Sequence, residues 1–260
     1  MNQLDMNFVA KHIKSAAGRH PDFENIKTVL LKKAPSRHTL FEFFMNDNLY
    51  RYLTKRDTVP NDSFEYMQMM IEAYKVAGYD YCTLQGSDFG FHRKDIDHKK
   101  SISLNEGVII YDEESYENYR WLEPEDFNYC RLNKLKLPDG MKIILSGPGG
   151  VLENVIALVG FDNLCYMIAD NPDLLVQIFK DVGSRLLKYY EICAGYDSVG
   201  ALISNDDWGF NTQTMISVDD MRKYVFPWHQ KIAKAAHNAG KPLILHFCGK
   251  KRMQKEWRTL

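Results

Sequence analysis

The fold is decided by VGALISNDDW, residues 199–208, and by PLILHFCG, residues 242–249. Each is an apolar run of strand length that ends in polar or small residues. Between them, residues 217–220 (SVDD) predict the capped start of a helix, and Gly240 predicts its end. Apolar strands joined by an amphipathic helix are typical of a parallel sheet with right-handed crossovers.

The same unit of strand, polar strand end and helix recurs upstream. We expect strands at residues 40–44, 81–85 and 141–145, a helix from Asn61 or Asp62 to Gly78, and another from Asn171-Pro172 to about Cys193. A doubly wound sheet and a (β/α)8 barrel both fit this pattern. The run at 40–44 favours the barrel, because Leu40, Glu42 and Phe44 would point inward and barrel interiors accept polar residues near the catalytic end.

The totals exclude several classes of protein. The net charge of -1 gives no global field that would attract nucleic acid or an anionic membrane. The five cysteines are scattered, with no C-x-x-C pair, so we expect free thiols and a reducing, cytoplasmic location. No run resembles a signal peptide or a membrane span. We expect a cytoplasmic enzyme with a small-molecule substrate and neither nucleic acid nor a membrane as partner.

The domain organisation is predicted to be a single, incomplete α/β domain of the (β/α)8 TIM-barrel type. Residues 1–33 would form an N-terminal helical extension, 34–249 the barrel, and 250–260 a basic tail outside the pattern. About five of the eight barrel strands are found, so the barrel is predicted to be truncated at its C-terminal side. An unclosed barrel exposes strand edges, and we expect oligomers to form through them.

A candidate metal site lies on the last predicted strand. His246 and Cys248 are two residues apart, so their side chains share one face near the carboxyl end of the strand. An imidazole and a thiolate are ligands that zinc prefers, and a third ligand would complete a catalytic site. The alternative is a buried histidine beside a small apolar cysteine.

Polar residues at the other strand ends are candidates for catalysis and substrate binding. Asp207 shares a face with Asn205 and would orient substrate or act as a general base; the alternative is capping of the next turn. Glu42 interrupts an apolar run, so we expect its carboxylate to be paired inside the barrel. Asp88 is a third catalytic candidate, although its place after Gly86-Ser87 favours a plain turn aspartate. The predicted substrate-binding residues are Asn205, Trp208 and Ser146, the last of which opens the glycine-rich turn 146–150.

Three segments, in order, resemble the uroporphyrinogen decarboxylase-like superfamily, especially its bacterial branch. They are LFEFF at 40–44, SGPGG at 146–150 with the long helix that follows, and NDDWGF at 205–210 through HFCG at 246–249. The similarity covers about residues 34–249. It implies a (β/α)8 barrel and one of two kinds of chemistry.

One branch of the superfamily removes carboxylate groups from a tetrapyrrole and binds them with an arginine pair after its first strand. Here residues 45–48 (MNDN) contain no arginine, and the first one is Arg51. The other branch resembles zinc-dependent methyltransferases that move a methyl group from a corrinoid, often held by a partner protein, to a thiol.

In the methyltransferase branch, a histidine and a cysteine in an H-x-C pattern bind zinc together with a later cysteine. His246 and Cys248 match the first two ligands, and no third ligand is found in this chain. The resemblance thus implies a zinc-dependent methyltransferase. A decarboxylase-type lyase and a degenerate, non-catalytic barrel remain as alternatives.

Overall fold

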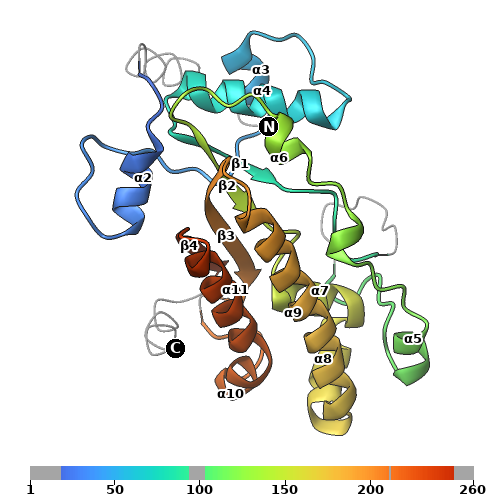
Figure 1. Ribbon diagram of the computed structural model, residues 1–260. Helices are drawn as coiled ribbons and strands as arrows, with labels where there is room; N and C mark the ends of the chain where they lie inside the picture. Colours follow the sequence, from blue (N-terminus) through green and yellow to red (C-terminus); the bar gives the residue numbers. More distant parts are fainter. Residues whose placement is uncertain (1–18, 94–102, 211, 249–260) are drawn as a thin grey trace.

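The computed structural model describes residues 19–93, 103–210 and 212–248, apart from the side chain of Cys248. Its centre is a four-stranded parallel sheet in the order β1-β2-β3-β4 (Figure 1). The strands are β1 (Tyr81–Gln85), β2 (Lys142–Ser146), β3 (Val199–Asp207) and β4 (Leu243–Cys248). Each strand pairs with the next one along the chain, which is the order of strands in a barrel wall. The structure is therefore an α/β fold, and closure into a barrel stays a prediction.

The helices lie before, between and beside these strands. They are α2 (Phe23–Leu30), α3 (Asp47–Thr54), α4 (Ser63–Ala77), α5 (Glu113–Glu117), α6 (Arg131–Lys134), α7 (Val151–Val159), α8 (Phe161–Asp170), α9 (Pro172–Ala194), α10 (Val218–Asp220) and α11 (Phe226–Asn238), with a 3-10 turn η1 (Pro124–Asp126) and a π-helical turn η2 (Met221–Val225). Helices α9 and α11 pack on one another and on β3, and α4 packs on β1 (Figure 1). Ile143, Ile144 and Leu145 of β2 are fully buried, so the middle of the sheet forms the core.

The capping residues predicted from the sequence are confirmed. The Asp62 carboxylate accepts a hydrogen bond from the backbone N–H of Glu65 at the start of α4, and Gly78 ends this helix with φ of 87°. Asn171 caps α9, which has proline at its first position. Ser217 caps the helical segment that leads through η2 into α11. These local signals set the ends of the helices and, with them, where each strand begins.

The predictions for the strands near residues 81–85, 141–145, 199–203 and 242–249 are confirmed, but the prediction of a strand at 40–44 is wrong. The backbone of Glu42 pairs with a side chain instead of a strand: the Tyr81 hydroxyl lies 2.7 Å from its N and 2.8 Å from its O. Phe41 and Phe44 are 49% and 68% exposed. The described residues thus contain four strands of the sheet, not five.

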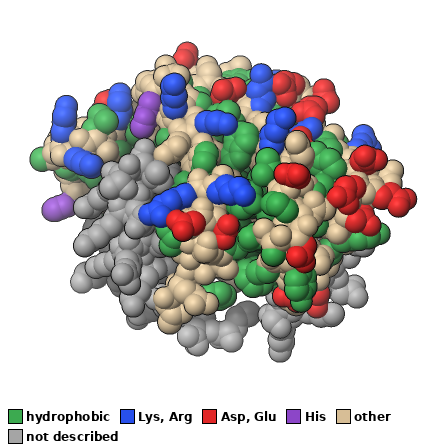
Figure 2. All heavy atoms as spheres, turned by 90° about the horizontal axis from the view of Figure 1, so that it is seen from below, with side chains coloured by type: hydrophobic (Ala, Val, Ile, Leu, Met, Phe, Trp, Pro, Cys, Tyr) green, Lys and Arg blue, Asp and Glu red, His purple; other side chains and the backbone are tan. Residues whose placement is uncertain are grey.

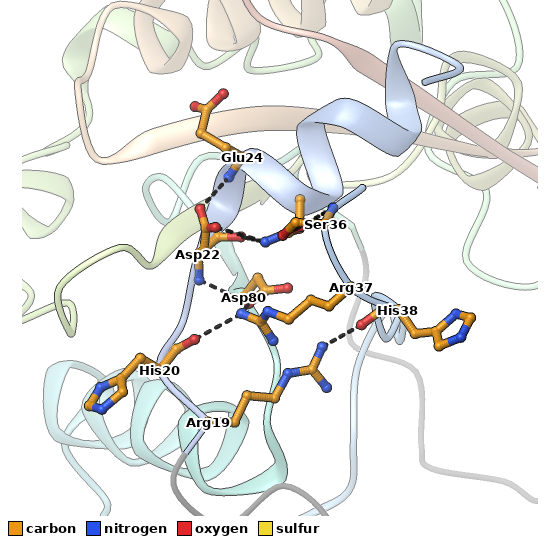
Figure 3. Close-up of polar contacts among 9 residues, drawn as sticks. Arg19, His20, Asp22, Glu24, Ser36, Arg37, His38 and Asp80 are labelled. Carbon is orange, nitrogen blue, oxygen red and sulfur yellow. Dashed lines mark hydrogen bonds and ion pairs between the residues drawn. The ribbon is translucent and has the colours of Figure 1, made fainter. Parts of the chain in front are cut away.

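A cluster of polar contacts pins the N-terminal segment to the amino end of the sheet (Figure 3). Asp80, directly before β1, has a side chain only 2% exposed. Its Oδ1 accepts hydrogen bonds from Arg37 Nη2 at 2.6 Å and from the backbone N of Asp22 at 2.9 Å. Arg37 also bonds to the carbonyl of His20, and Arg19 bonds to that of His38. At this end of the sheet, the polar contacts therefore join the N-terminal segment to the residue that precedes β1.

Residues 1–18 and 250–260 lie outside the described residues. The predicted extension and the predicted basic tail therefore stay predictions. Within the described part of the chain, no helix alone has the length and apolar character needed to cross a membrane. The bent pair α7 and α8, which turns by 94°, meets those two criteria only when the helices are taken together.

Candidate active site

The carboxyl ends of β2, β3 and β4 meet at one edge of the sheet. Strand register pairs Asn205 with His246 and Asp207 with Cys248. Alternation along β3 turns Asp206 to the opposite face of the sheet from its two neighbours. The two adjacent aspartates therefore have different surroundings.

The side chain of Asp206 points from β3 toward helices α7 and α11, and the residue is only 2% exposed. Its Oδ1 accepts a hydrogen bond from the backbone N of Glu153 at 3.0 Å, and its Oδ2 accepts one from that of Leu152 at 3.1 Å. Oδ2 also lies 2.8 Å from Nε2 of His229, whose Nδ1 lies 3.1 Å from the hydroxyl of Ser204. One buried carboxylate thus joins β3 to the first turn of α7 and to α11.

Glu153 is the third residue of α7, and its carboxylate turns back toward the strand ends. Its Oε2 accepts a hydrogen bond from the backbone N of Gly150 at 2.8 Å and one from Asn205 Nδ2 at 3.3 Å. Burial raises the pKa of Glu153 above its ordinary value, and the charges of Asp206 and Asp207 raise it further. Glu153 therefore keeps its proton to a higher pH than an ordinary glutamate does, which suits a group that gives and takes protons.

A cavity of about 500 Å³ lies beside Glu153. Asp207 and Arg93 contribute two more charged side chains to its lining. The guanidinium of Arg93 donates a 2.7 Å hydrogen bond to Asn154 Oδ1, and the carboxylate of Asp207 accepts one of 3.2 Å from the backbone N of Gly209. The other residues that line the cavity are Ser103, Leu104, Glu106, Gly107, Pro148, Gly149, Ile156, Ala157 and Met215. Among the described residues, its lining offers carboxylates, the guanidinium of Arg93 and an apolar surface to a small molecule.

A second, mostly apolar cavity of about 460 Å³ adjoins the first. Its walls are Phe43, Phe44, Tyr66, Met67, Met70, Thr83, Leu84, Gln85, Ser146, Gly147, Gly149 and Asn205. Gly149 lines both cavities, and the hydrogen bond from Asn205 to Glu153 joins a residue of one wall to a residue of the other.

The surface at this end of the molecule carries no single sign of charge. Figure 2 views the end toward which β3 runs in Figure 1, and acidic, basic and apolar side chains are intermixed there.

Three of the predicted site residues line the cavities. Asp207 lines the charged cavity, and Ser146 and Asn205 line the apolar one. Asp207 and Asn205 lie on one face of β3, as their spacing predicts. Their roles in catalysis and binding stay predictions.

Three other predicted residues lie elsewhere. Glu42 is exposed, and its Oε1 accepts the backbone N–H of Phe43, so the expectation of a paired carboxylate inside the barrel is wrong. Asp88 is 76% exposed and pairs with Arg131 at 2.6 Å. Trp208 is 1% exposed and stacks on Phe247 with ring centroids 4.7 Å apart. None of the three lines either cavity.

The metal prediction concerns the end of β4. The side chain of His246 is exposed, and its ring centroid lies 5.4 Å from that of Phe43. The backbone of Cys248 lies in register with Asp207, while its side chain falls outside the described atoms. Among the described residues no three His, Cys, Asp or Glu side chains are grouped so that they could hold a metal ion. The donor types suit zinc, but the described part of the chain does not complete a zinc site.

Sequence reasoning missed Glu153, Asp206, His229 and Arg93. Two of them had a signal. Glu153 stands three residues after Gly150 at a helix start, the spacing of a capping box. His229 continues the helical spacing of buried positions in α11 and is fully buried. Arg93 follows a strand in an irregular segment, so only the folded chain brings it to the cavity.

A family model for uroporphyrinogen decarboxylase (URO-D) matches residues 127–259, half of the 260-residue chain. The chain belongs to the uroporphyrinogen decarboxylase family. The URO-D match spans β2, β3 and β4 and thus includes Glu153, Asp206 and Asp207. Arg93 precedes the matched region.

A solved structure supports the fold of this URO-D family member. The structure of a methyltransferase from Methanosarcina mazei superposes with a TM-score of 0.53 at 13% sequence identity. The match covers 86% of this chain and 69% of that one. At this identity the likeness concerns the fold. No curated protein matches the chain.

Proposed function

We propose that this chain is a methyltransferase that moves a methyl group from a corrinoid to a thiol acceptor. The observation that carries the proposal is the register of β3 and β4. It brings His246 and Cys248 to the strand edge that also carries Asn205 and Asp207, beside the charged cavity. The methyltransferase from Methanosarcina mazei, which has a similar fold, supports the same class of reaction.

Zinc is the metal that this proposal requires. His246 and Cys248 would supply two of its three protein ligands, and the third would come from outside the described residues. When bound, zinc lowers the pKa of a coordinated thiol, so that the acceptor is a thiolate at neutral pH.

The charged cavity supplies the remaining requirements. The acceptor sulfur forms a bond to the methyl carbon while the cobalt–carbon bond of the corrinoid breaks and its electron pair stays on cobalt. The acceptor must first lose its thiol proton, and the carboxylate of Glu153, whose pKa is raised by burial, is suited to take it. Arg93 would orient an acidic group on the acceptor.

The test measures zinc content and methyl transfer in the same preparations. Methylcobalamin serves as donor and 3-mercaptopropionate as acceptor. We expect stoichiometric zinc in the wild type, and in His246→Ala and Cys248→Ser a loss of zinc with transfer at least ~100-fold slower. His237→Ala and Cys165→Ser are matched controls, because both side chains are exposed and neither lies on a strand of the sheet or lines the charged cavity. Normal transfer by Cys248→Ser without zinc would refute the proposal.

A decarboxylase is the second candidate, and one observation favours it. Arg93 and Glu153 line the same cavity, so a cation that binds carboxylates lies near a group that retains a proton. In that reaction the bond from carbon to carboxylate breaks, carbon dioxide leaves, and the electron pair left on carbon takes a proton. Carbon dioxide release from uroporphyrinogen, lost in Arg93→Ala, would favour this candidate. If zinc-loaded protein showed neither methyl transfer nor carbon dioxide release, the result would favour a non-catalytic protein.

A further inference from the structure

The first turn of α7 is capped from another part of the chain. The N-cap residue of this helix, Gly150, has no side chain with which to bind the free backbone N–H groups. The carboxylate of Asp206 binds those of Leu152 and Glu153 instead. A Cβ atom on Gly150 would come within 2.2 Å of the Asp206 carboxyl group, so only glycine leaves room for this arrangement.

The same turn carries Glu153, which is held at both of its polar ends. Its backbone N–H is bound by Asp206. Its carboxylate is bound by the backbone N–H of Gly150 and by the amide of Asn205. Asp206 does not line either cavity, and its side chain is fully buried on the far face of β3. It therefore acts on the cavity only through α7.

We propose that Asp206 is a positioning residue that holds Glu153 at the wall of the charged cavity through the first turn of α7. His229 supports it from behind, since its Nε2 lies 2.8 Å from Asp206 Oδ2. The proposal rests on the proposed role of Glu153 as the proton-transfer group. It makes Asp206, which touches no substrate, necessary for the proton transfer.

The charges around Glu153 determine how its titration should respond. Asp206 and Asp207 face it from β3, and Arg93 faces it from the segment after β1. Replacing Asp206 by asparagine removes one negative charge, which makes the ionised form of Glu153 less costly. The pKa of Glu153 should then fall. Because the lost charge alone lowers this pKa, the position of Glu153 is tested by a variant that keeps the charge of Asp206 and changes its contacts.

The experiment follows the carboxyl carbon of Glu153 by NMR during a pH titration, and Glu153→Gln identifies the signal. In Asp206→Asn we expect the midpoint to move to lower pH, kcat to fall ~10- to 100-fold and KM to change little. The acidic limb of the kcat profile should move with the NMR midpoint. Asp170→Asn, an exposed aspartate at the end of α8, serves as the matched control.

A second variant keeps the test decisive if Asp206→Asn does not fold. His229→Leu removes the hydrogen bond to Asp206 Oδ2 and keeps the charge of Asp206, so a shift of the Glu153 midpoint in this variant would come from a changed position of the Asp206 carboxylate. An unchanged midpoint in a folded variant overturns the positioning role. A shifted midpoint in a protein that shows no methyl transfer upholds the positioning of Glu153 and rejects the proposed reaction.

Discussion

The two ends of the sheet each bury an aspartate, but they use it differently. At the amino end, Asp80 binds Arg37 and a backbone N–H of the N-terminal segment, and it lines neither of the two cavities described above. At the carboxyl end, Asp206 binds the helix turn that presents Glu153 to a cavity. A buried carboxylate therefore fixes the N-terminal segment at one end of the sheet and positions a cavity residue at the other. Parallel α/β folds place their sites at the carboxyl ends of the strands.

The largest effect should come from removing the carboxylate at the carboxyl end. Asp206→Ala leaves two backbone N–H groups and His229 without their acceptor inside the protein. We expect a loss of about 3–5 kcal/mol in the free energy of unfolding, together with loss of activity. Urea unfolding followed by circular dichroism measures it. A smaller loss of unfolding free energy in Asp206→Ala than in Asp80→Ala would show that the aspartate at the amino end matters more for stability.

Substitution of the buried aspartate at the amino end should reduce stability less and should leave activity unchanged. Asp80→Ala removes the acceptor of Arg37 and of the backbone N–H of Asp22, but the Arg37 side chain is 28% exposed and regains water. We expect a loss of about 1–3 kcal/mol with kcat unchanged at temperatures where the variant is folded. Urea unfolding and the methyl-transfer assay measure the two effects. A fall in kcat would show that the amino end also shapes the site.

The pH dependence of stability should reveal the charge on Asp80. Burial raises the pKa of Asp80 above its ordinary value, more than Arg37 and the Asp22 N–H lower it. The folded protein therefore binds this proton more tightly than the unfolded chain, and that contribution is lost as pH rises from about 4 through the raised pKa.

The wild type should thus lose stability relative to Asp80→Asn between about pH 4 and 7, because asparagine does not titrate. Glu153, whose pKa is also raised, should show the same sign in Glu153→Gln. Unfolding free energies at both pH values test each pair. A wild type that gained stability relative to these variants over this range would show that the pKa values are lowered.

The smallest effect should come from an exposed ion pair. Asp88 is 76% exposed and contacts Arg131 at 2.6 Å. We expect Asp88→Ala to cost less than about 1 kcal/mol and to leave kcat unchanged, since water replaces the lost contact. Thermal unfolding and the transfer assay measure it. A large loss of activity would support the prediction that Asp88 is a catalytic residue.

Much of the sheet could be predicted from the sequence, because its signals are local. An apolar run and a polar end predict the strand near 199–207, and its alternation places Asn205 and Asp207 on one face. The run at 40–44 has the same local pattern and is not a strand. Pairing with a neighbouring strand is decided by distant residues, and here the Tyr81 hydroxyl binds the backbone of Glu42 instead.

The sequence alone determined the parallel α/β class, the helix caps and the strand edge at which polar residues gather, since spacing and local hydrogen bonding act over a few residues. Only the tertiary structure decided which carboxylates form the site. Asp206 and Glu153 are 53 positions apart, and Arg93 and Asn154 are 61 apart. Contacts over such separations depend on how helices pack on the sheet, which no local pattern encodes.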